Sequence, residues 1–281
     1  MLTLDTKKKL LDSISKAPCS IQELAFELDK NWRTVDGYIA KLVDEGLVKI
    51  KEFKKGSRVS FKIVFMQPDI NHNISNVQKE ILAQIDTGQR SQDFSSLNLV
   101  QYIDDKNIKA YYSAINLSID KITYDLNNFL NKAQSTILMF SGDLSWVDLH
   151  TKKSSIIETL KELAKQKINI KILARVDLTT KKRIEKLMRI NTELGFNTIE
   201  IRHKEHPLRC FIIDGKTVRL KEPAFESIKG KLEKVGTYFY EFSDIEWSNW
   251  LEKVFWNKFR TSVSAEKRLE LLDNIEKLKK K

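Results

Sequence analysis

The sequence of 281 residues contains little cysteine and lacks the histidine patterns that bind metals. Cys19 and Cys210 lie far apart in the chain, and each stands beside apolar residues. Two cysteines placed in this way exclude a disulfide framework and a zinc site built from cysteines. The four histidines show neither HxxxH nor HExxH spacing. We therefore expect no metal and no cofactor, and we interpret both cysteines as small core residues.

Long apolar runs and Pro/Gly-rich tracts are also missing. The sequence has no run of about 18 apolar residues, which is the length that a membrane-spanning helix needs. Its start, MLTLDTKKKLL, has neither the apolar core nor the cleavage site of a signal peptide. The sequence therefore predicts a cytoplasmic protein, and its length predicts about two domains.

Basic residues are in excess. The chain carries 49 Lys and Arg against 38 Asp and Glu, which gives a formal net charge of +11. Such an excess favours a polyanionic partner, with double-stranded DNA first. A general richness in lysine would give the same total, so the placement of the charges has to decide.

The first 66 residues predict three short helices followed by a hairpin. Residues 5–16 form the first, and Ser20 with Glu23 gives the capping-box signature of the second. Asn31 is a suitable cap for the third, NWRTVDGYIAKLVDEGLV, in which Val35 and Ile39 recur at helical spacing. Two β-like runs, LVKIKEF and RVSFKIVF, then follow, joined by the basic turn KKGS.

Three helices and a basic hairpin over residues 1–66 resemble the winged helix-turn-helix domains of archaeal and bacterial regulators. In such domains the third helix lies in the major groove and the hairpin contacts phosphates. The resemblance implies two sets of DNA contacts: Asn31, Arg33, Thr34, Tyr38 and Lys41 on the third helix, and Lys54, Lys55, Ser57 and Arg58 on the hairpin. Trp32 is expected to pack rather than to read bases. A winged helix used for protein contacts is the alternative.

The middle of the chain predicts a linker and then a dimerisation helix. Residues 67–104 lose strong pattern apart from one short amphipathic helix, Val77–Ile85. Within 105–133, apolar residues recur at alternating spacings of four and three, which predicts a coiled coil joining two chains. An amphipathic helix packed on its own domain would show the same spacing. The positions are Ile108, Tyr112, Ile115, Ile119, Ile122, Leu126 and Phe129.

Residues 134–262 predict an α/β domain, since β-like runs alternate with amphipathic helices. The expected strands are 136–142, 168–176 and 197–204, and a hairpin is expected across Asp214 and Gly215. A helix rich in aromatic residues, 243–259, follows, and residues 263–281 predict a basic C-terminal helix. The fold class is therefore α/β plus an N-terminal winged helix.

The stretch HPLRCFIIDG, residues 206–215, resembles the motif of phospholipase D, in which a histidine attacks phosphorus and a lysine holds the phosphoryl oxygens. Counted back from Asp214, Arg209 stands at the lysine position and Pro207 at that of the nucleophile. His206 is one place early, and a one-residue slip in a strand reverses the side-chain direction. No second copy of the motif occurs. These departures imply a non-catalytic domain in which Arg209 and Asp214 form a structural ion pair, or in which His206, Arg209 and Asp214 form a remnant anion site.

The order of winged helix, coiled-coil helix and degenerate phospholipase D-like domain resembles the archaeal TrmB-like transcription regulators. The resemblance implies a dimeric DNA-binding regulator, associated with the nucleoid, whose C-terminal domain serves sensing or assembly. It leaves a small-molecule effector possible and unidentified, since no sugar-binding cluster is apparent. Two alternatives remain: a phosphodiesterase or nuclease using His206, Arg209 and Asp214, and a sequence-nonspecific chromatin protein.

Overall fold

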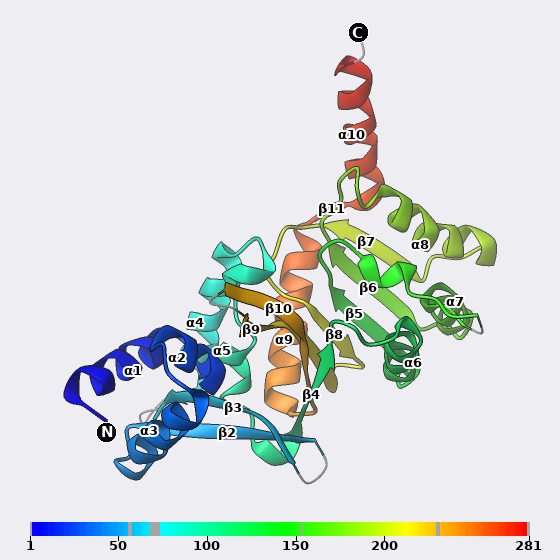
Figure 1. Cartoon of the computed structure of the whole chain (residues 1–281). Coiled ribbons are helices and arrows are strands. Elements are labelled where there is room, and N and C mark those ends of the chain that lie inside the picture. Colours follow the sequence, from blue (N-terminus) through cyan, green and yellow to red (C-terminus); the bar gives the residue numbers. More distant parts are fainter. Residues whose placement is uncertain (1, 56–57, 68–73, 153, 229–230, 280–281) are drawn as a thin grey trace. The chain divides into compact units, whose positions relative to one another are not determined.

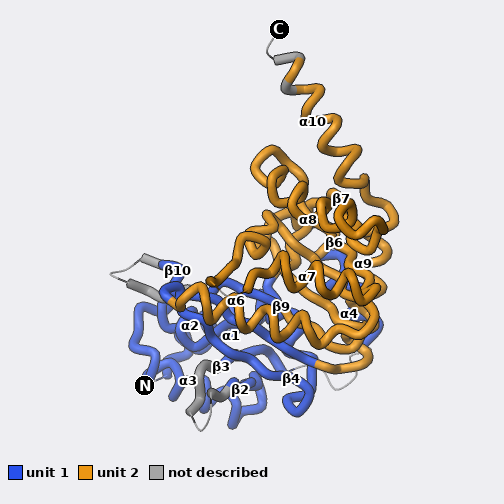
Figure 2. Tube along the Cα trace, turned by 90° about the vertical axis from the view of Figure 1, so that its right-hand side faces the viewer, with its two compact units in different colours: residues 1–84, 95–116, 221–242 blue, residues 85–94, 117–220, 243–281 orange. Residues whose placement is uncertain are grey.

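The computed structural model describes residues 2–55, 58–67, 74–152, 154–228 and 231–279 (Figure 1). The chain divides into two compact units, which Figure 2 shows in two colours. Unit 1 contains Met1–Gln84, Ser95–Asn116 and Lys221–Phe242. Unit 2 contains Ile85–Phe94, Leu117–Leu220 and Ser243–Lys281. Each unit is therefore built from segments that are distant in the sequence.

Unit 1 begins with a winged helix-turn-helix, as the sequence predicts. Its elements are α1 (Leu4–Lys16), β1 (Cys19–Ser20), α2 (Ile21–Glu27), α3 (Trp32–Asp44), β2 (Val48–Lys55) and β3 (Arg58–Met66). The three strands form one sheet in the order β1-β3-β2. The core between the helices and this sheet contains Leu10, Leu24, Val35, Ile39, Leu42 and Val64.

Local hydrogen bonds fix where these helices begin. The Ser20 hydroxyl accepts from the N–H of Glu23 at 3.1 Å, and the Glu23 carboxylate accepts from the N–H of Ser20 at 2.7 Å. This is the predicted capping box, which satisfies two N–H groups that a helix start leaves unpaired. The Asn31 side chain likewise caps α3, because its oxygen accepts from the N–H of Arg33 at 2.9 Å.

The hairpin of β2 and β3 is covered on both faces. On one face Val48, Ile50 and Val64 pack against the helices. On the other face Lys51 is buried, and the ring of Phe53 meets that of Tyr240 edge-on, with centroids 5.8 Å apart. Tyr240 belongs to β10, far along the chain. The winged helix is thus built into a larger unit.

Residues 67–104 are not a linker. They contain the predicted short helix, α4 (Ile74–Thr87), and further on η1 (Ser91–Asp93) and α5 (Leu97–Val100); residues 68–73 lie outside the described ones. Leu99 and Val100 are fully buried and Ile103 is 2 % exposed. The segment from Ser95 onwards is therefore part of the core of unit 1. Its polar composition gave no indication of this burial.

The predicted coiled-coil helix over residues 105–133 is wrong. Residues 105–107 form η2 (Asp105–Asn107), residues 108–114 form strand β4 (Ile108–Ala114), and only α6 (Ile119–Leu130) is a long helix. Strand β4 pairs antiparallel with β10 (Lys231–Phe242), with Tyr112 opposite Tyr238. The apolar residues at alternating spacings of four and three thus belong partly to a strand and partly to a helix. The spacing was misleading because isoleucine and tyrosine are also favoured in strands.

Burial also divides the seven predicted dimerisation residues. Ile108, Leu126 and Phe129 are buried, whereas Ile115 and Ile119 are 67 % and 59 % exposed. Tyr112 and Ile122 are half-buried. Leu126 and Phe129 belong to the core of unit 2, so their side chains are already used within the chain.

Unit 2 is mixed α/β. Strands β5 (Thr136–Phe140), β6 (Asn169–Ala174) and β7 (Ile199–His203) run parallel. Strand β8 (Cys210–Ile213) pairs antiparallel with β5, and the start of β9 (Thr217–Ile228) pairs antiparallel with β8. The short β11 (Val263–Ser264) pairs with β7. Both the parallel layer and the hairpin across Asp214 and Gly215 are as predicted, and the fold class, α/β plus an N-terminal winged helix, is confirmed.

Helices cover both faces of this sheet (Figure 1). Helices α6, α7 (Ile156–Lys165) and α8 (Lys181–Leu194) pack on one face, where Ile137 and Met139 of β5 join their core. On the other face the aromatic helix α9 (Ile245–Arg260) packs Phe255 edge-on against Phe140, with ring centroids 5.2 Å apart. Helix α10 (Ala265–Lys279) starts in the core at Ala265 and Leu269, so the C-terminal helix belongs to this unit at its start.

Candidate nucleic-acid interface

Helix α3 presents a polar face from which two cations extend. Arg33, Thr34 and Lys41 are exposed, and neither cation forms an ion pair in the described part of the chain. Two nearby acids are paired: the Asp36 carboxylate lies 2.8 Å from the Lys62 ammonium, and that of Glu45 lies 2.5 Å from Lys7. Arg33 and Lys41 therefore outnumber the one acid of α3, Asp44, that is exposed and forms no ion pair among the described residues.

Two of the predicted contacts on α3 have other roles. Tyr38 is only 9 % exposed and packs in the core of the winged helix, so its prediction as a DNA contact is wrong. It lies three residues after Val35 and four before Leu42, which places it on the buried stripe of the helix. The oxygen of Asn31 is used as the helix cap, although the residue itself is exposed.

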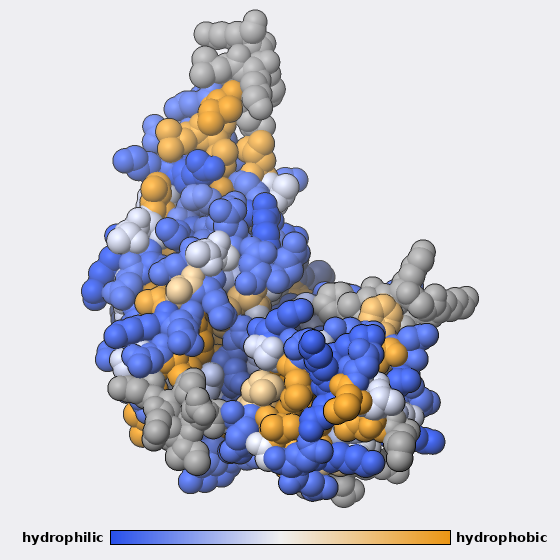
Figure 3. All heavy atoms as spheres, turned by 90° about the vertical axis from the view of Figure 1, so that its left-hand side faces the viewer, coloured by the Kyte–Doolittle hydropathy of each residue, from blue (hydrophilic) through white to orange (hydrophobic). Residues whose placement is uncertain are grey.

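Trp32 is exposed rather than packed. Nearly half of its surface, 49 %, is accessible, and the Arg33 guanidinium carbon lies 5.5 Å from the centre of its ring. Figure 3 shows the face on the left of Figure 1, where small hydrophobic patches lie among hydrophilic residues. The sequence signal for this exposure was present, because Trp32 follows the cap Asn31 and precedes the first buried position, Val35.

The predicted wing contacts stand at the ends of β2 and β3. Lys55 is the register partner of Arg58, and Lys54 that of Val59. The side chains of Lys54, Lys55 and Arg58 lie outside the described residues, as does all of Ser57. The backbone therefore places these three cations at the tip of the hairpin, where their contact with phosphates stays a prediction.

The residues of HPLRCFIIDG do not form one site. In the register of β8 and β5, Cys210 lies opposite Phe140 and Ile213 opposite Ile137. Arg209 therefore lies at the carboxyl end of β5 and Asp214 at its amino end. The hypothesis of an ion pair or anion site shared by His206, Arg209 and Asp214 is wrong, because a whole strand separates the two charged residues.

His206 is a core residue. It is 2 % exposed, its Nε2 lies 3.2 Å from the carbonyl oxygen of Leu173, and its ring meets Phe140 edge-on. Burial lowers the pKa of His206 to about 3. A ring enclosed in this way offers no nitrogen to a bound phosphodiester, and we infer a packing role for it.

Arg209 lies flat over a glycine. Its Nη1 donates to the carbonyl oxygen of Leu208 at 2.7 Å, and a Cβ added at Gly142 would come within 2.4 Å of Nη2. Burial is the largest cause that lowers the pKa of Arg209; Arg175 and Arg90 lower it further, and Asp143 opposes them. The guanidinium is therefore held largely by backbone carbonyls.

Asp214 holds the start of β5. Its carboxylate accepts from the backbone N–H groups of Gln134, Ser135 and Thr136, at 2.9, 2.8 and 2.8 Å. Burial raises its pKa, but these donors outweigh burial and leave the pKa below its usual value. Both Asp214 and Gly215 adopt positive φ, 52° and 64°, which makes the turn tight. The role of Asp214 is thus structural.

Metal sites and membrane-spanning helices are two further features for which the described residues are decisive. They contain no group of three His, Cys, Asp or Glu placed to hold a metal ion. None of the helices described combines the length and the apolar character needed to cross a membrane.

Three helices, a paired hairpin and a third helix whose exposed face bears Arg33 and Lys41 define the winged helix-turn-helix class. Within it, residues 5–49 match the model of the family described as bacterial regulatory protein, arsR family. This match covers α1 to the start of β2 and confirms the N-terminal domain as a helix-turn-helix of that kind. No curated protein matches the chain in sequence.

Solved structures resemble the chain weakly. TrmBL2, described as an archaeal chromatin protein, is 13 % identical over 91 % of this chain and 90 % of its own, with a TM-score of 0.40. Nuc of Salmonella typhimurium, a phospholipase D family member, is 12 % identical over 56 % of this chain and 96 % of its own, also at 0.40. NucT from Helicobacter pylori is 12 % identical over 56 % and 99 %, at 0.38. At such scores the likeness supports no functional conclusion.

Proposed function

We propose that this protein is a DNA-binding transcription regulator that acts as a dimer, with a C-terminal unit that has no catalytic role. The observation that carries the proposal is the regulator-family match of residues 5–49, which contain an exposed third helix with the unpaired cations Arg33 and Lys41. In helix-turn-helix proteins this helix enters the major groove, where arginine reads guanine. The protein acts on chromosomal DNA in the cytoplasm.

Fluorescence anisotropy with labelled duplex DNA tests the proposal. Reversing both charges, Arg33→Glu with Lys41→Glu, is expected to weaken binding by at least tenfold, and the affinity of the wild type is expected to fall steeply with salt. The matched control reverses two exposed lysines of unit 2, Lys253→Glu with Lys267→Glu. Equal losses in both double variants would show that only the total charge matters.

Competition with random DNA separates a regulator from a chromatin protein. A regulator binds its own sites typically 10³- to 10⁷-fold more tightly than other DNA. We expect genomic fragments selected by the protein to outcompete random DNA of equal length. Equal competition by the two would favour sequence-nonspecific coating of DNA.

The non-catalytic role of unit 2 is supported by the burial of His206 and by Pro207 at the nucleophile register. A phosphodiesterase of the phospholipase D type needs an accessible histidine nucleophile here. We expect the purified protein to release no product from a phosphodiester substrate or from DNA. Hydrolysis that disappeared in His206→Ala or Arg209→Ala, with the fold intact, would overturn this part of the proposal.

Dimerisation is supported by Ile115 and Ile119, the two of the seven predicted seam residues that are exposed. A second half-site contact would also supply the affinity that one winged helix lacks. Sedimentation velocity measures it directly: the wild type is expected to be a dimer, and Ile115→Glu with Ile119→Glu to be a monomer. If both the wild type and the double variant were dimers, Ile115 and Ile119 would not form the dimer interface.

A further inference from the structure

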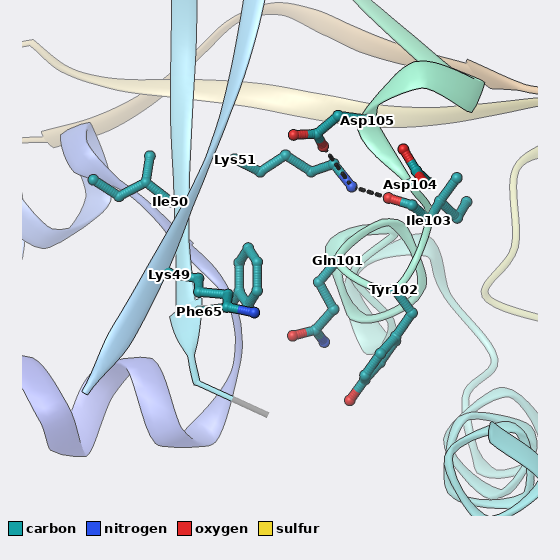
Figure 4. A pocket seen from close by; sticks show the side chains of 9 residues that line it. All are labelled: Lys49, Ile50, Lys51, Phe65, Gln101, Tyr102, Ile103, Asp104 and Asp105. Atoms are coloured by element: carbon teal, nitrogen blue, oxygen red, sulfur yellow. Dashed lines mark hydrogen bonds and ion pairs between the residues drawn. The ribbon is translucent and has the colours of Figure 1, made fainter. Parts of the chain in front are cut away.

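A pocket of about 370 Å³ lies within unit 1, between the wing hairpin and a loop that follows α5 (Figure 4). One wall comes from neighbouring strands β2 and β3, and the other from residues 101–105. This volume falls at the lower end of the range for pockets that hold small organic molecules. The lining residues are Lys49, Ile50, Lys51, Phe65, Gln101, Tyr102, Ile103, Asp104 and Asp105.

Lys51 ties the two walls together. Its side chain is 5 % exposed, and its ammonium lies 3.1 Å from the carboxylate of Asp105. The same ammonium donates to the carbonyl oxygens of Val100, at 3.1 Å, and of Ile103. A buried charge must be compensated in this way. Lys51 is therefore fully used, and it holds β2 against the loop.

The acids of the pocket are already neutralised. Asp105 is paired with Lys51, and the carboxylate of Asp104 lies 3.2 Å from the ammonium of Lys106 and accepts from that residue's N–H at 3.0 Å. The remaining cation, Lys49, forms no ion pair in the described part of the chain and is exposed. Figure 4 shows its ammonium on the side of Gln101, across the opening. The uncompensated charge in the pocket is thus a single positive one.

The polar and apolar groups of the pocket are arranged in a way that suits an amphipathic guest. Lys49 and Phe65 are register partners on the adjacent strands, so the ammonium stands next to an aromatic ring. The amide of Gln101 donates to the carbonyl oxygen of Asn98 at 3.0 Å, which leaves its oxygen toward the opening. Together with the half-buried ring of Tyr102, these groups offer one cation, one hydrogen-bond acceptor and a small apolar surface.

We propose that this pocket binds a small organic anion with a flat apolar body, such as an aromatic acid, as the effector of the regulator. The anionic group pairs with Lys49, an N–H or O–H of the ligand donates to the Gln101 oxygen, and the flat body lies against the half-buried ring of Tyr102. The effector role of the ligand rests on the proposed function. The binding of an anion in the pocket is independent of the proposed function.

Occupation of the pocket reaches the DNA-binding tip through β2. This strand runs from Val48 to Lys55, so the pocket residues Lys49 and Lys51 precede the predicted phosphate contacts Lys54 and Lys55 on one continuous strand. A ligand that bridges β2 and residues 101–105 restrains the hairpin at its base. The ligand shifts the equilibrium between the restrained and the unrestrained hairpin by the difference between its affinities for these two states.

The first test uses 8-anilino-1-naphthalenesulfonate, an aromatic anion whose fluorescence increases in apolar surroundings, with the full-length protein and no DNA. We expect saturable binding of one probe per chain. Lys49→Glu is expected to weaken it at least tenfold, and Gln101→Trp, which fills the opening, to abolish it. Lys109→Glu, the same charge change at an exposed residue of β4, is expected to leave it unchanged. Circular dichroism confirms that each variant is folded.

Equal probe binding by wild type, Lys49→Glu and Gln101→Trp would overturn the site, whatever the protein does with DNA. The second test measures anisotropy of labelled DNA with and without saturating probe. We expect the DNA affinity to change at least threefold in the wild type and not at all in Gln101→Trp. Saturable probe binding with no change in DNA affinity would overturn the effector role, and absence of DNA binding without probe would instead overturn the proposed function.

Discussion

The guanidinium carbon of Arg33 lies 5.5 Å from the centre of the Trp32 ring, at the first turn of α3. Both side chains are exposed, so the pair is not a product of core packing. An arginine over a tryptophan face is stabilised by about 0.5–1 kcal/mol at such sites. Residues at the amino end of a recognition helix contact base edges. Trp32 therefore restrains Arg33, the residue that we propose to read a base.

Removing the ring is expected to weaken DNA binding through Arg33. Arg33→Ala is expected to reduce affinity by about 1–3 kcal/mol and to relax the preference at one base pair. Trp32→Ala is expected to weaken binding less, and to have almost no effect once Arg33 is alanine. Anisotropy on the wild type, both single variants and the double variant measures this coupling. Losses that simply add would show that the two residues act independently.

The sequence was enough to predict the elements whose determinants are local. Ser20 with Glu23 marked the start of α2 and Asn31 that of α3, because a helix cap involves residues three positions apart or fewer. The turn at Asp214 and Gly215 was predictable for the same reason. None of these features depends on where distant segments lie.

Features that depend on distant partners were not predictable. Ile108 and Tyr112 are spaced as in a helix, yet they pair with β10 residues more than a hundred positions away. Tyr38 was assigned to the polar face together with Arg33 and Lys41, although its position belongs to the buried stripe. Lys51 stands at an inward position of an alternating strand, but its partners, Ile103 and Asp105, come from a segment that lacks pattern.

The wing is expected to contribute affinity without sequence preference. Lys54 and Lys55 end β2, and each phosphate contact releases counterions from DNA. Replacing both with glutamine is expected to lower the slope of log affinity against log salt by about 1 per lysine. The preferred DNA sequence is expected to stay the same. An unchanged slope, as expected for the control Lys253→Gln, would place the wing away from DNA.

Asp214 is expected to matter for folding rather than for chemistry. Its carboxylate accepts three backbone N–H groups at the start of β5, and its φ of 52° is unfavourable for alanine. Asp214→Ala is expected to lower the free energy of unfolding by about 2–4 kcal/mol, since it removes bonds to a charged acceptor. Asp214→Asn, which tolerates this φ and keeps one acceptor oxygen, is expected to lower the free energy of unfolding by less than Asp214→Ala does. Urea unfolding compares them, and equal stability of Asp214→Ala and wild type would refute this role.

His206 is expected to make the fold sensitive to acid. Burial lowers its pKa to about 3 in the folded protein, against an ordinary value near 6.5 in the unfolded chain. Between these two values the unfolded chain binds a proton that the folded protein does not, so stability falls as the pH falls from 6.5 towards 3. The contribution of one such group is at most about 1.4 kcal/mol per pH unit.

Urea unfolding at a series of pH values from 7 to 4 tests this. The free energy of unfolding is expected to fall more steeply with decreasing pH in the wild type than in His206→Gln. His150→Gln, at an exposed histidine, is expected to match the wild type. Parallel curves for all three proteins would mean that His206 takes up its proton without unfolding the chain.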